Sequence, residues 1–170
     1  MRIEVNLQQP WREVAYFYYQ NKAAFDALLE KVKDRSRTFD FYGMTCGDLC
    51  TLIDGGFPAS LQKLSDGLTV KGYCQLINSV RDGLKGFATY LEKTTPPTTP
   101  LQRRAAAGMM ETTTEEMILL QLKDFYTLHS LEDAQKLTVY EFMIARKAEY
   151  NQRLAEYNMQ KIMEQKSKQR

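Results

Sequence analysis

Hydrophobic residues along this chain recur mainly three and four positions apart, which is the spacing of amphipathic helices. The first such run starts at Pro10, a residue suited to the first turn of a helix, and ends at Val32. Its apolar positions are Trp11, Val14, Ala15, Tyr18, Phe25, Leu28, Leu29 and Val32. The run predicts one continuous amphipathic helix of about six turns.

Two short stretches alternate between apolar and polar residues instead. Ile3, Val5 and Leu7 carry the alternation in residues 2–8, and two phenylalanines carry it in residues 38–42. Alternation of this kind is typical of a half-buried strand. The sequence therefore leaves open one or two short strands in a chain that is otherwise predicted to be all-α.

Capping signals and helix breakers divide the middle of the chain. Thr45 stands three residues before Asp48, an acidic form of the capping-box spacing, and starts a short helix that "DGG" at residues 54–56 ends. The following "FPASLQKLSDG" predicts a loop with a single helical turn, since proline biases the residue before it away from helical geometry.

Thr69 then caps a longer helix, which keeps helical spacing from Val70 to Leu91. This helix contains Gly72, Gly83 and Gly86. Each glycine costs roughly 1 kcal/mol relative to alanine in a helix interior. The three glycines indicate either the close approach of another element or a bend.

The clearest boundary is "TTPPTTP", because consecutive prolines remove backbone donors and fix an extended chain. The next residues, "LQRRAAAGMM", fit either a short basic helix or part of a mobile linker. The chain is thus predicted to comprise an N-terminal helical part (residues 1–93), a Pro/Thr-rich connector (94–111) and a C-terminal helical hairpin (112–170).

Beyond Gly108 the chain contains neither glycine nor proline, so only capping signals divide it. Thr112 and Thr113 each precede a glutamate by three residues, and Ser130 stands before a short helical turn. Thr138 opens the last helix, with a glutamate three residues later. This helix is predicted to run from Val139 to about residue 165, a length of roughly 40 Å.

The apolar stripe of the last helix is wide. One line of residues along it is Met143, Tyr150, Leu154 and Tyr157, and the adjacent line is Ile144, Ala148, Ala155, Met159 and Ile162. A single packed neighbour would not cover both lines. We therefore expect part of this stripe to contact another molecule.

The composition is that of a globular chain, with 44% hydrophobic and 26% charged residues. The formal net charge of +2 does not provide the concentrated basic face that nucleic acids and membrane surfaces select. Basic residues at Arg103, Arg104 and the C-terminus are interpreted as solvated helix ends. We expect a protein partner or a second copy of the chain, and neither nucleic acid nor a membrane.

Several features predict a cytoplasmic protein. The opening "MRIEVNLQQPWREV" lacks the apolar core and cleavage site of a secretory signal, and no stretch approaches a transmembrane span. Cys46, Cys50 and Cys74 are an odd number of cysteines, which favours reduced and buried thiols over a disulfide framework.

Candidate catalytic residues are sparse. His129 is the only histidine, and its predicted place at a helix end favours capping or surface packing. With the three cysteines it offers a Cys₃His set, but only one cysteine pair has zinc-knuckle spacing and that pair lies on a predicted helix. Tyr126 stands where a di-iron bundle would need glutamate, and no glycine stretch matches a phosphate-binding loop. The sequence therefore predicts a non-enzymatic protein without cofactor or metal.

An aromatic cluster, "VAYFYYQ", lies in the first predicted helix. Tyr18 falls on its buried face, whereas Tyr16, Phe17 and Tyr19 point elsewhere around it. Aromatic side chains are enriched at interfaces because a ring supplies a large contact area at small entropic cost. Either another element of the chain covers these three residues or a partner does.

Residues 122–165, "LKDFYTLHSLEDAQKLTVYEFMIARKAEYNQRLAEYNMQKIMEQ", resemble the C-terminal helical part of small tailed-phage proteins of the tail assembly chaperone type. The resemblance rests on an "LT-x-x-EF" helix start, here Leu137, Thr138, Glu141 and Phe142, followed by a long helix of Ala, Tyr and charged residues. It is confined to the C-terminal third of the chain.

The resemblance implies a non-enzymatic protein that coats the apolar helices of a tape-measure protein, in the host cell cytoplasm, until the tail tube polymerises around them. A Met and Tyr stripe fits such adaptable binding. The predicted contact residues are Tyr150, Leu154, Tyr157 and Met159, with Tyr16, Phe17 and Tyr19 as a second set. The alternative is a virion-associated structural subunit, such as a connector or tail-completion ring component, in which the same stripe forms a permanent interface.

Overall fold

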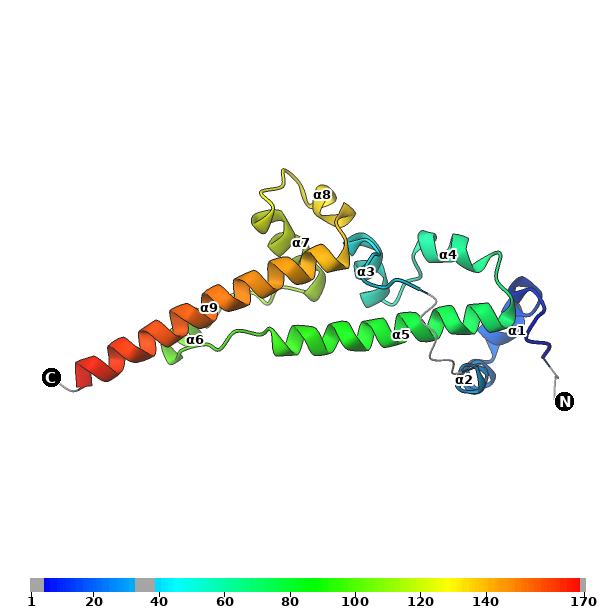
Figure 1. Ribbon diagram of the computed structural model, residues 1–170, viewed down its shortest axis with the longest axis horizontal. Helices are drawn as coiled ribbons and strands as arrows, with labels where there is room; N and C mark the ends of the chain where they lie inside the picture. The colour runs from blue at the N-terminus through cyan, green and yellow to red at the C-terminus, as the bar shows by residue number, and fades with distance from the viewer. Residues whose placement is uncertain (1–4, 33–38, 169–170) are drawn as a thin grey trace. The chain divides into compact units, whose positions relative to one another are not determined.

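The regular structure of the chain is helical throughout the residues that the computed structural model describes, 5–32 and 39–168. These residues form nine α-helices and one 3₁₀ helix, and they contain no sheet (Figure 1). Extended pairing is limited to two isolated bridges, between Pro10 and Thr69 and between Thr45 and Thr138. The all-α fold predicted from the sequence, with a long C-terminal helix, is confirmed.

The chain divides into two compact units. Unit 1 comprises Met1–Met44 and Asp48–Phe87, and unit 2 comprises Thr45–Gly47 and Ala88–Arg170. The division thus lies inside the long helix α5 (Val70–Lys93) and not at the predicted connector. The last turns of α5 belong to unit 2 because they are fixed there, for example by Tyr90 Oη, which donates a hydrogen bond to the Met143 carbonyl at 2.6 Å.

The first predicted helix is broken into three pieces, so the prediction of one continuous helix was wrong. They are η1 (Trp11–Glu13), α1 (Ala15–Gln20) and α2 (Lys22–Lys31). Asn21 separates α1 from α2 at φ −130° and ψ 79°, and its side-chain oxygen accepts a hydrogen bond from the Ala24 N–H at 3.2 Å. Asparagine favours such local bonds over a helix interior, so Asn21 ends one helix and caps the next.

The two stretches with strand-like alternation form no strand in their described parts, residues 5–8 and 39–42. Residues 2–4 and 38 lie outside the described residues. Leu7 nevertheless packs against the hydrophobic core of unit 1, so an apolar residue is favoured at this position although no sheet forms.

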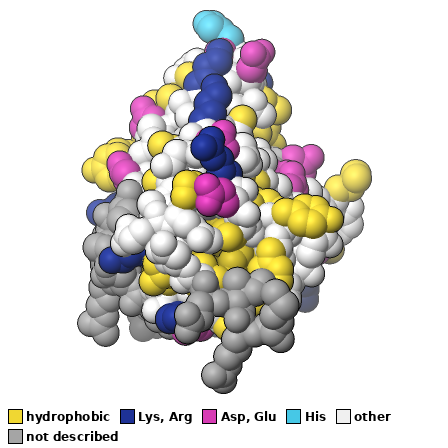
Figure 2. All heavy atoms as spheres, turned by 90° about the vertical axis from the view of Figure 1, so that its right-hand side faces the viewer, with side chains coloured by type: hydrophobic (Ala, Val, Ile, Leu, Met, Phe, Trp, Pro, Cys, Tyr) yellow, Lys and Arg dark blue, Asp and Glu magenta, His cyan; other side chains and the backbone are white. Residues whose placement is uncertain are grey.

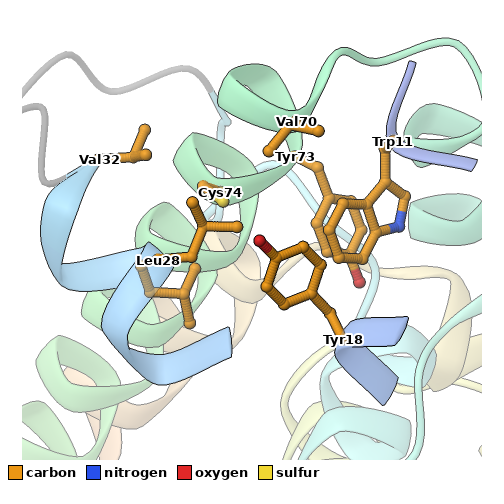
Figure 3. Close-up of a cluster of buried hydrophobic side chains, with 8 residues drawn as sticks. Trp11, Tyr18, Leu28, Val32, Val70, Tyr73 and Cys74 are labelled. Carbon is orange, nitrogen blue, oxygen red and sulfur yellow. The ribbon is translucent and has the colours of Figure 1, made fainter. Parts of the chain in front are cut away.

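The core of unit 1 is an aromatic and aliphatic cluster where η1, α1 and α2 meet α5 (Figure 3). Its buried members are Trp11, Tyr18, Leu28, Leu29, Val32, Val70, Tyr73 and Cys74. The Trp11 and Tyr73 rings stack with centroids 3.9 Å apart and planes 9° apart, and Tyr18 stacks on Trp11 at 5.8 Å. Aromatic contacts of this kind add to the stabilisation from burial alone.

Two short helices complete unit 1. The helix α3 (Cys46–Ile53) belongs to unit 1 from Asp48 onward. Gly55 lies just beyond its end at a φ of +80°, which suits glycine, so the stretch that the sequence predicts to end the helix does so. The predicted loop after it is a seven-residue helix, α4 (Ala59–Ser65). Leu61 of α4 is buried against two residues of α5, and this packing supplies the stabilisation that a single helical turn lacks.

Gly83 of α5 marks a close approach and not a bend, because α5 continues through it as one helix. A Cβ atom added at Gly83 would lie 2.8 Å from the Phe41 Cβ and closer still to the ring carbon Cγ. The buried Phe41 ring therefore sits directly on the backbone of α5.

Unit 2 contains α6 (Pro100–Ala105), α7 (Thr114–Phe125), α8 (Leu131–Lys136) and α9 (Val139–Lys168). The stretch that the sequence left open between helix and linker starts with α6. The capping boxes predicted at Thr113 and Thr138 are formed, and the Ser130 side chain caps α8. The core combines one face of α7 with the first turns of α9, and its fully buried side chains are Ile118, Leu122, Ala134, Val139, Phe142 and Ala145.

Candidate protein interaction site

The second half of α9 exposes large apolar side chains on one face. Every residue from Asn158 to Lys168 is exposed, and Met159, Ile162 and Met163 retain 63%, 51% and 67% of their accessible surface. These three residues lie at helical spacing, so they share one side of the helix. Figure 1 shows α9 (orange to red) extending past the short helix α7 within unit 2.

The four contact residues predicted first do not form one patch. Tyr150, Leu154 and Tyr157 share one side of α9 and are half-buried, whereas Met159 lies about 180° around the helix from Tyr150 and is exposed. The Lys161 ammonium lies over the Tyr157 ring, 4.6 Å from its centroid. Met163, which the sequence prediction omitted, joins Met159 instead.

A groove runs between α7 and the first half of α9. It has a volume of about 570 Å³. Its lining residues are Thr112, Met117, Leu120, Gln121, Asp124, Phe125, Ala145, Arg146, Ala148, Glu149, Gln152 and Arg153. The exposed Ala148 leaves room beside α9, and the exposed Leu120 and Phe125 form an apolar wall on α7. These twelve residues define the groove.

Periodicity alone does not indicate the groove, because the exposed Leu120 and Phe125 are apolar positions of α7 like its buried ones. The signal present in the sequence was the small residue Ala148. A small residue leaves space on a helix face, but it does not reveal which neighbour stands across that space.

The polar residues of the groove differ in how they are paired. Glu149 forms an ion pair with Arg153 and accepts a hydrogen bond from the Gln121 amide nitrogen. Arg146 is held by Thr94, whose hydroxyl oxygen accepts from its Nε at 3.3 Å. Among the described residues, Asp124 makes no ion pair, so its carboxylate is available at the groove edge.

A second hollow of about 410 Å³ continues the groove along α9. It is lined by Gln102, Glu149, Gln152, Arg153 and Glu156, three of which also line the groove. The open surface of unit 2 therefore follows α9 for several turns.

The second predicted contact set lies in unit 1 and is exposed there. Tyr16 and Tyr19 retain 78% and 62% of their surface, while Phe17 is at the border of half-buried. Tyr19 also contacts Trp11 edge-on, with centroids 6.1 Å apart, so its ring rests partly on the core. Figure 2 views a face on which hydrophobic side chains reach the surface between polar ones.

The three cysteines are buried, as the sequence predicts. Burial raises the pKa of the Cys74 thiol to about 11. Burial also raises the pKa of the neighbouring Tyr73, and its hydrogen bond with Tyr19 raises it further. The raised pKa keeps the Cys74 thiol protonated at neutral pH, as is typical of a cysteine in a hydrophobic core.

His129 is exposed and lies in the loop between α7 and α8. The sequence placed it at the end of a helix, but α7 already ends at Phe125. In the described parts of the chain, no three His, Cys, Asp or Glu side chains come together in a way that could hold a metal ion. Likewise, no helix there combines the length and apolarity that crossing a bilayer requires.

Comparisons with known proteins identify no family for this chain. No protein-family model, curated protein or solved structure matches it.

Proposed function

We propose that this chain is a non-enzymatic interaction protein that binds an apolar helical segment of another protein through the second half of α9. One observation carries the proposal: Met159, Ile162 and Met163 are exposed together on one face of a helix that extends beyond α7. Singly exposed apolar residues are ordinary on protein surfaces, but several on one face of an extended helix are typical of a docking surface.

The residue types favour an apolar helix as the partner. Methionine side chains are flexible and polarisable, so they adapt to partners that differ in detail. Two helices pack with side chains three and four residues apart interlocking, which is the spacing of the exposed face. Tyr150, Leu154 and Tyr157 on the other side of α9 add half-buried apolar area for a partner that wraps the helix.

The resemblance of residues 122–165 to tail assembly chaperones supports a place in phage particle assembly. In that setting the partner is a tape-measure-like protein with long apolar helices, and the encounter takes place in the host cell cytoplasm. The work of the chain is then to keep such helices from aggregating until the tail tube encloses them.

The alternative function is that of a structural virion subunit. The groove favours it, because a permanent ring needs a second surface on each subunit and the groove is open beside α9. The two functions differ in how long the chain stays in its assembly. A ring subunit forms one large species that survives dilution, whereas a chaperone forms a small species that leaves the finished particle.

A peptide titration tests the proposal. The probe is a fluorescently labelled amphipathic helical peptide with a Leu-rich face, and its anisotropy is followed as the full chain is added. The wild type is expected to bind, and Met159→Glu with Ile162→Glu is expected to weaken binding by about 1 to 3 kcal/mol per residue if both are anchors.

The matched control is Gln160→Glu with Ser167→Glu, which adds the same charge about a quarter turn around the helix from the centre of the exposed face. It should leave peptide binding unchanged. Absence of binding by the wild type, or equal weakening by both double variants, would show that the exposed face of α9 is not the docking surface.

A further inference from the structure

The groove between α7 and α9 is open, and the exposed end of α9 has the shape to fill it. We propose that a second copy of this chain occupies the groove with its α9 tail, residues 155–163, running antiparallel to α9 of the first copy. The arrangement is reciprocal, so that each copy places its tail in the groove of the other. It adds the groove to the surfaces in use and places in it the same exposed face of α9 that the proposed function assigns to a partner, so dimer formation and partner binding compete for that face. The proposal does not rest on that function.

The first argument is a heptad pattern along α9. Five small or apolar residues and one glutamine recur three and four positions apart on one side of the helix, which is the spacing of a helix–helix seam. The seam comprises Ala145, Ala148, Gln152, Ala155, Met159 and Ile162. The first half lines the groove and the second half is exposed on the tail.

The second argument is the match of small against large side chains. An antiparallel pairing centred between Gln152 and Ala155 places Ala145 of one copy opposite Ile162 of the other and Ala148 opposite Met159. Ala148 is exposed, so Met159 enters the space beside it, whereas Ala145 is buried in the core of unit 2 and Ile162 covers the rim of the groove above it. Interdigitation of small and large residues is how helix interfaces reach the packing density of a protein interior.

The third argument is charge complementarity. The helices α7 and α9 are antiparallel, since Tyr126 Oη donates to the Glu141 carbonyl at one end and Gln121 donates to Glu149 further along. A tail that runs antiparallel to α9 therefore carries its basic end, with Lys166 and Lys168, toward the C-terminal end of α7. That end has the negative pole of the helix dipole and the unpaired Asp124 carboxylate.

A two-fold axis also fills both grooves with both tails at once. Each copy has one tail and one groove on the same helix, and a single rotation covers both pairs. Head-to-tail docking would leave a groove open at one end of the assembly and a tail open at the other. The closed dimer is therefore the arrangement that the two surfaces favour.

Cysteine crosslinking tests the pairing. Ala148→Cys and Met159→Cys are made as separate variants of the full chain, mixed at equal concentration and oxidised. Both positions are exposed, and the native cysteines are buried, so the introduced thiols react selectively. A disulfide-linked heterodimer is expected in the mixture, while each variant alone stays uncrosslinked.

The geometry makes this result specific. Positions 148 and 159 of one helix are about 16 Å apart, beyond the roughly 7 Å between Cα atoms that a disulfide spans. A bond between them therefore forms only between copies. The control mixture is Lys147→Cys with Gln160→Cys, exposed positions at the same level of the antiparallel pair that face away from the seam. It should not crosslink.

The mass of the unmodified protein gives a second readout. Light scattering after size exclusion should show a dimer, and Met159→Glu with Ile162→Glu should raise its dissociation constant at least about tenfold. Gln160→Glu with Ser167→Glu should raise it much less, because neither residue lies in the seam. A monomer at all concentrations, crosslinking within a single variant, or equal crosslinking of the control mixture would overturn the proposal. If crosslinking fails while the helical peptide still binds, the dimer is refuted and the proposed function stands.

Discussion

Replacing Gly83 by alanine sets a gain in helix propensity against a steric clash with Phe41. Alanine is favoured over glycine by about 1 kcal/mol in a helix interior, so helix propensity alone predicts a more stable protein. At Gly83, however, the added Cβ would lie 2.8 Å from the Phe41 Cβ and closer to its ring. Phe41 is buried and cannot swing into solvent, so either the ring or α5 must move.

The magnitude follows from overpacking. Inserting a methyl group into a packed core costs about 1 to 3 kcal/mol, and contact with a rigid ring favours the upper half of that range. After subtraction of the propensity gain, Gly83→Ala is expected to destabilise the protein by about 1 to 2 kcal/mol. For a chain of this size, each kcal/mol lowers the melting temperature by roughly 2 to 4 °C.

The matched control is Gly72→Ala in the same helix. There the nearest atom to an added Cβ is the Leu68 Cδ2 at 3.4 Å, an ordinary contact. Gly72→Ala should therefore raise stability by up to about 1 kcal/mol. Urea unfolding followed by circular dichroism at the helix band compares the two variants with the wild type. A Gly83→Ala protein as stable as the wild type, or more so, would refute the close approach of Phe41 to α5.

Two further predictions concern burial and capping. Because burial raises the pKa of Cys74 from 9.0 to about 11, the unfolded chain loses this proton first as pH rises. The contribution of the buried Cys74 thiol to the free energy of unfolding is fully present below about pH 8.5. It falls by about 2 to 3 kcal/mol between about pH 9 and 11. Cys74→Ala should flatten that part of the pH dependence in urea titrations, and an unchanged slope would contradict the assignment. Thr138→Ala removes the acceptor of the Glu141 N–H at 3.2 Å and should cost about 1 kcal/mol in thermal unfolding, whereas Thr138→Ser should restore most of it.

Local interactions made much of unit 2 predictable from the sequence. The boxes at Thr113 and Thr138 each join residues three positions apart, so their effect does not depend on the rest of the fold. The length of α9 follows from the absence of glycine and proline after Gly108. The burial of the three cysteines follows from their small apolar character in a helical pattern.

The three-dimensional arrangement decided what periodicity alone does not specify. The break at Asn21 depends on whether its side chain forms a local hydrogen bond or the helix continues through it. In the structure the helix is broken there, and Trp11 of the first piece packs on Tyr73. The apolar stripe of α9 is visible in the sequence, but which of its sides is covered depends on where α7 lies. Hence Tyr150 is half-buried and Met159 is exposed, although both are apolar positions of one helix. A sequence specifies how much apolar surface a helix presents, and only the positions of its neighbours determine how much of that surface remains for another molecule.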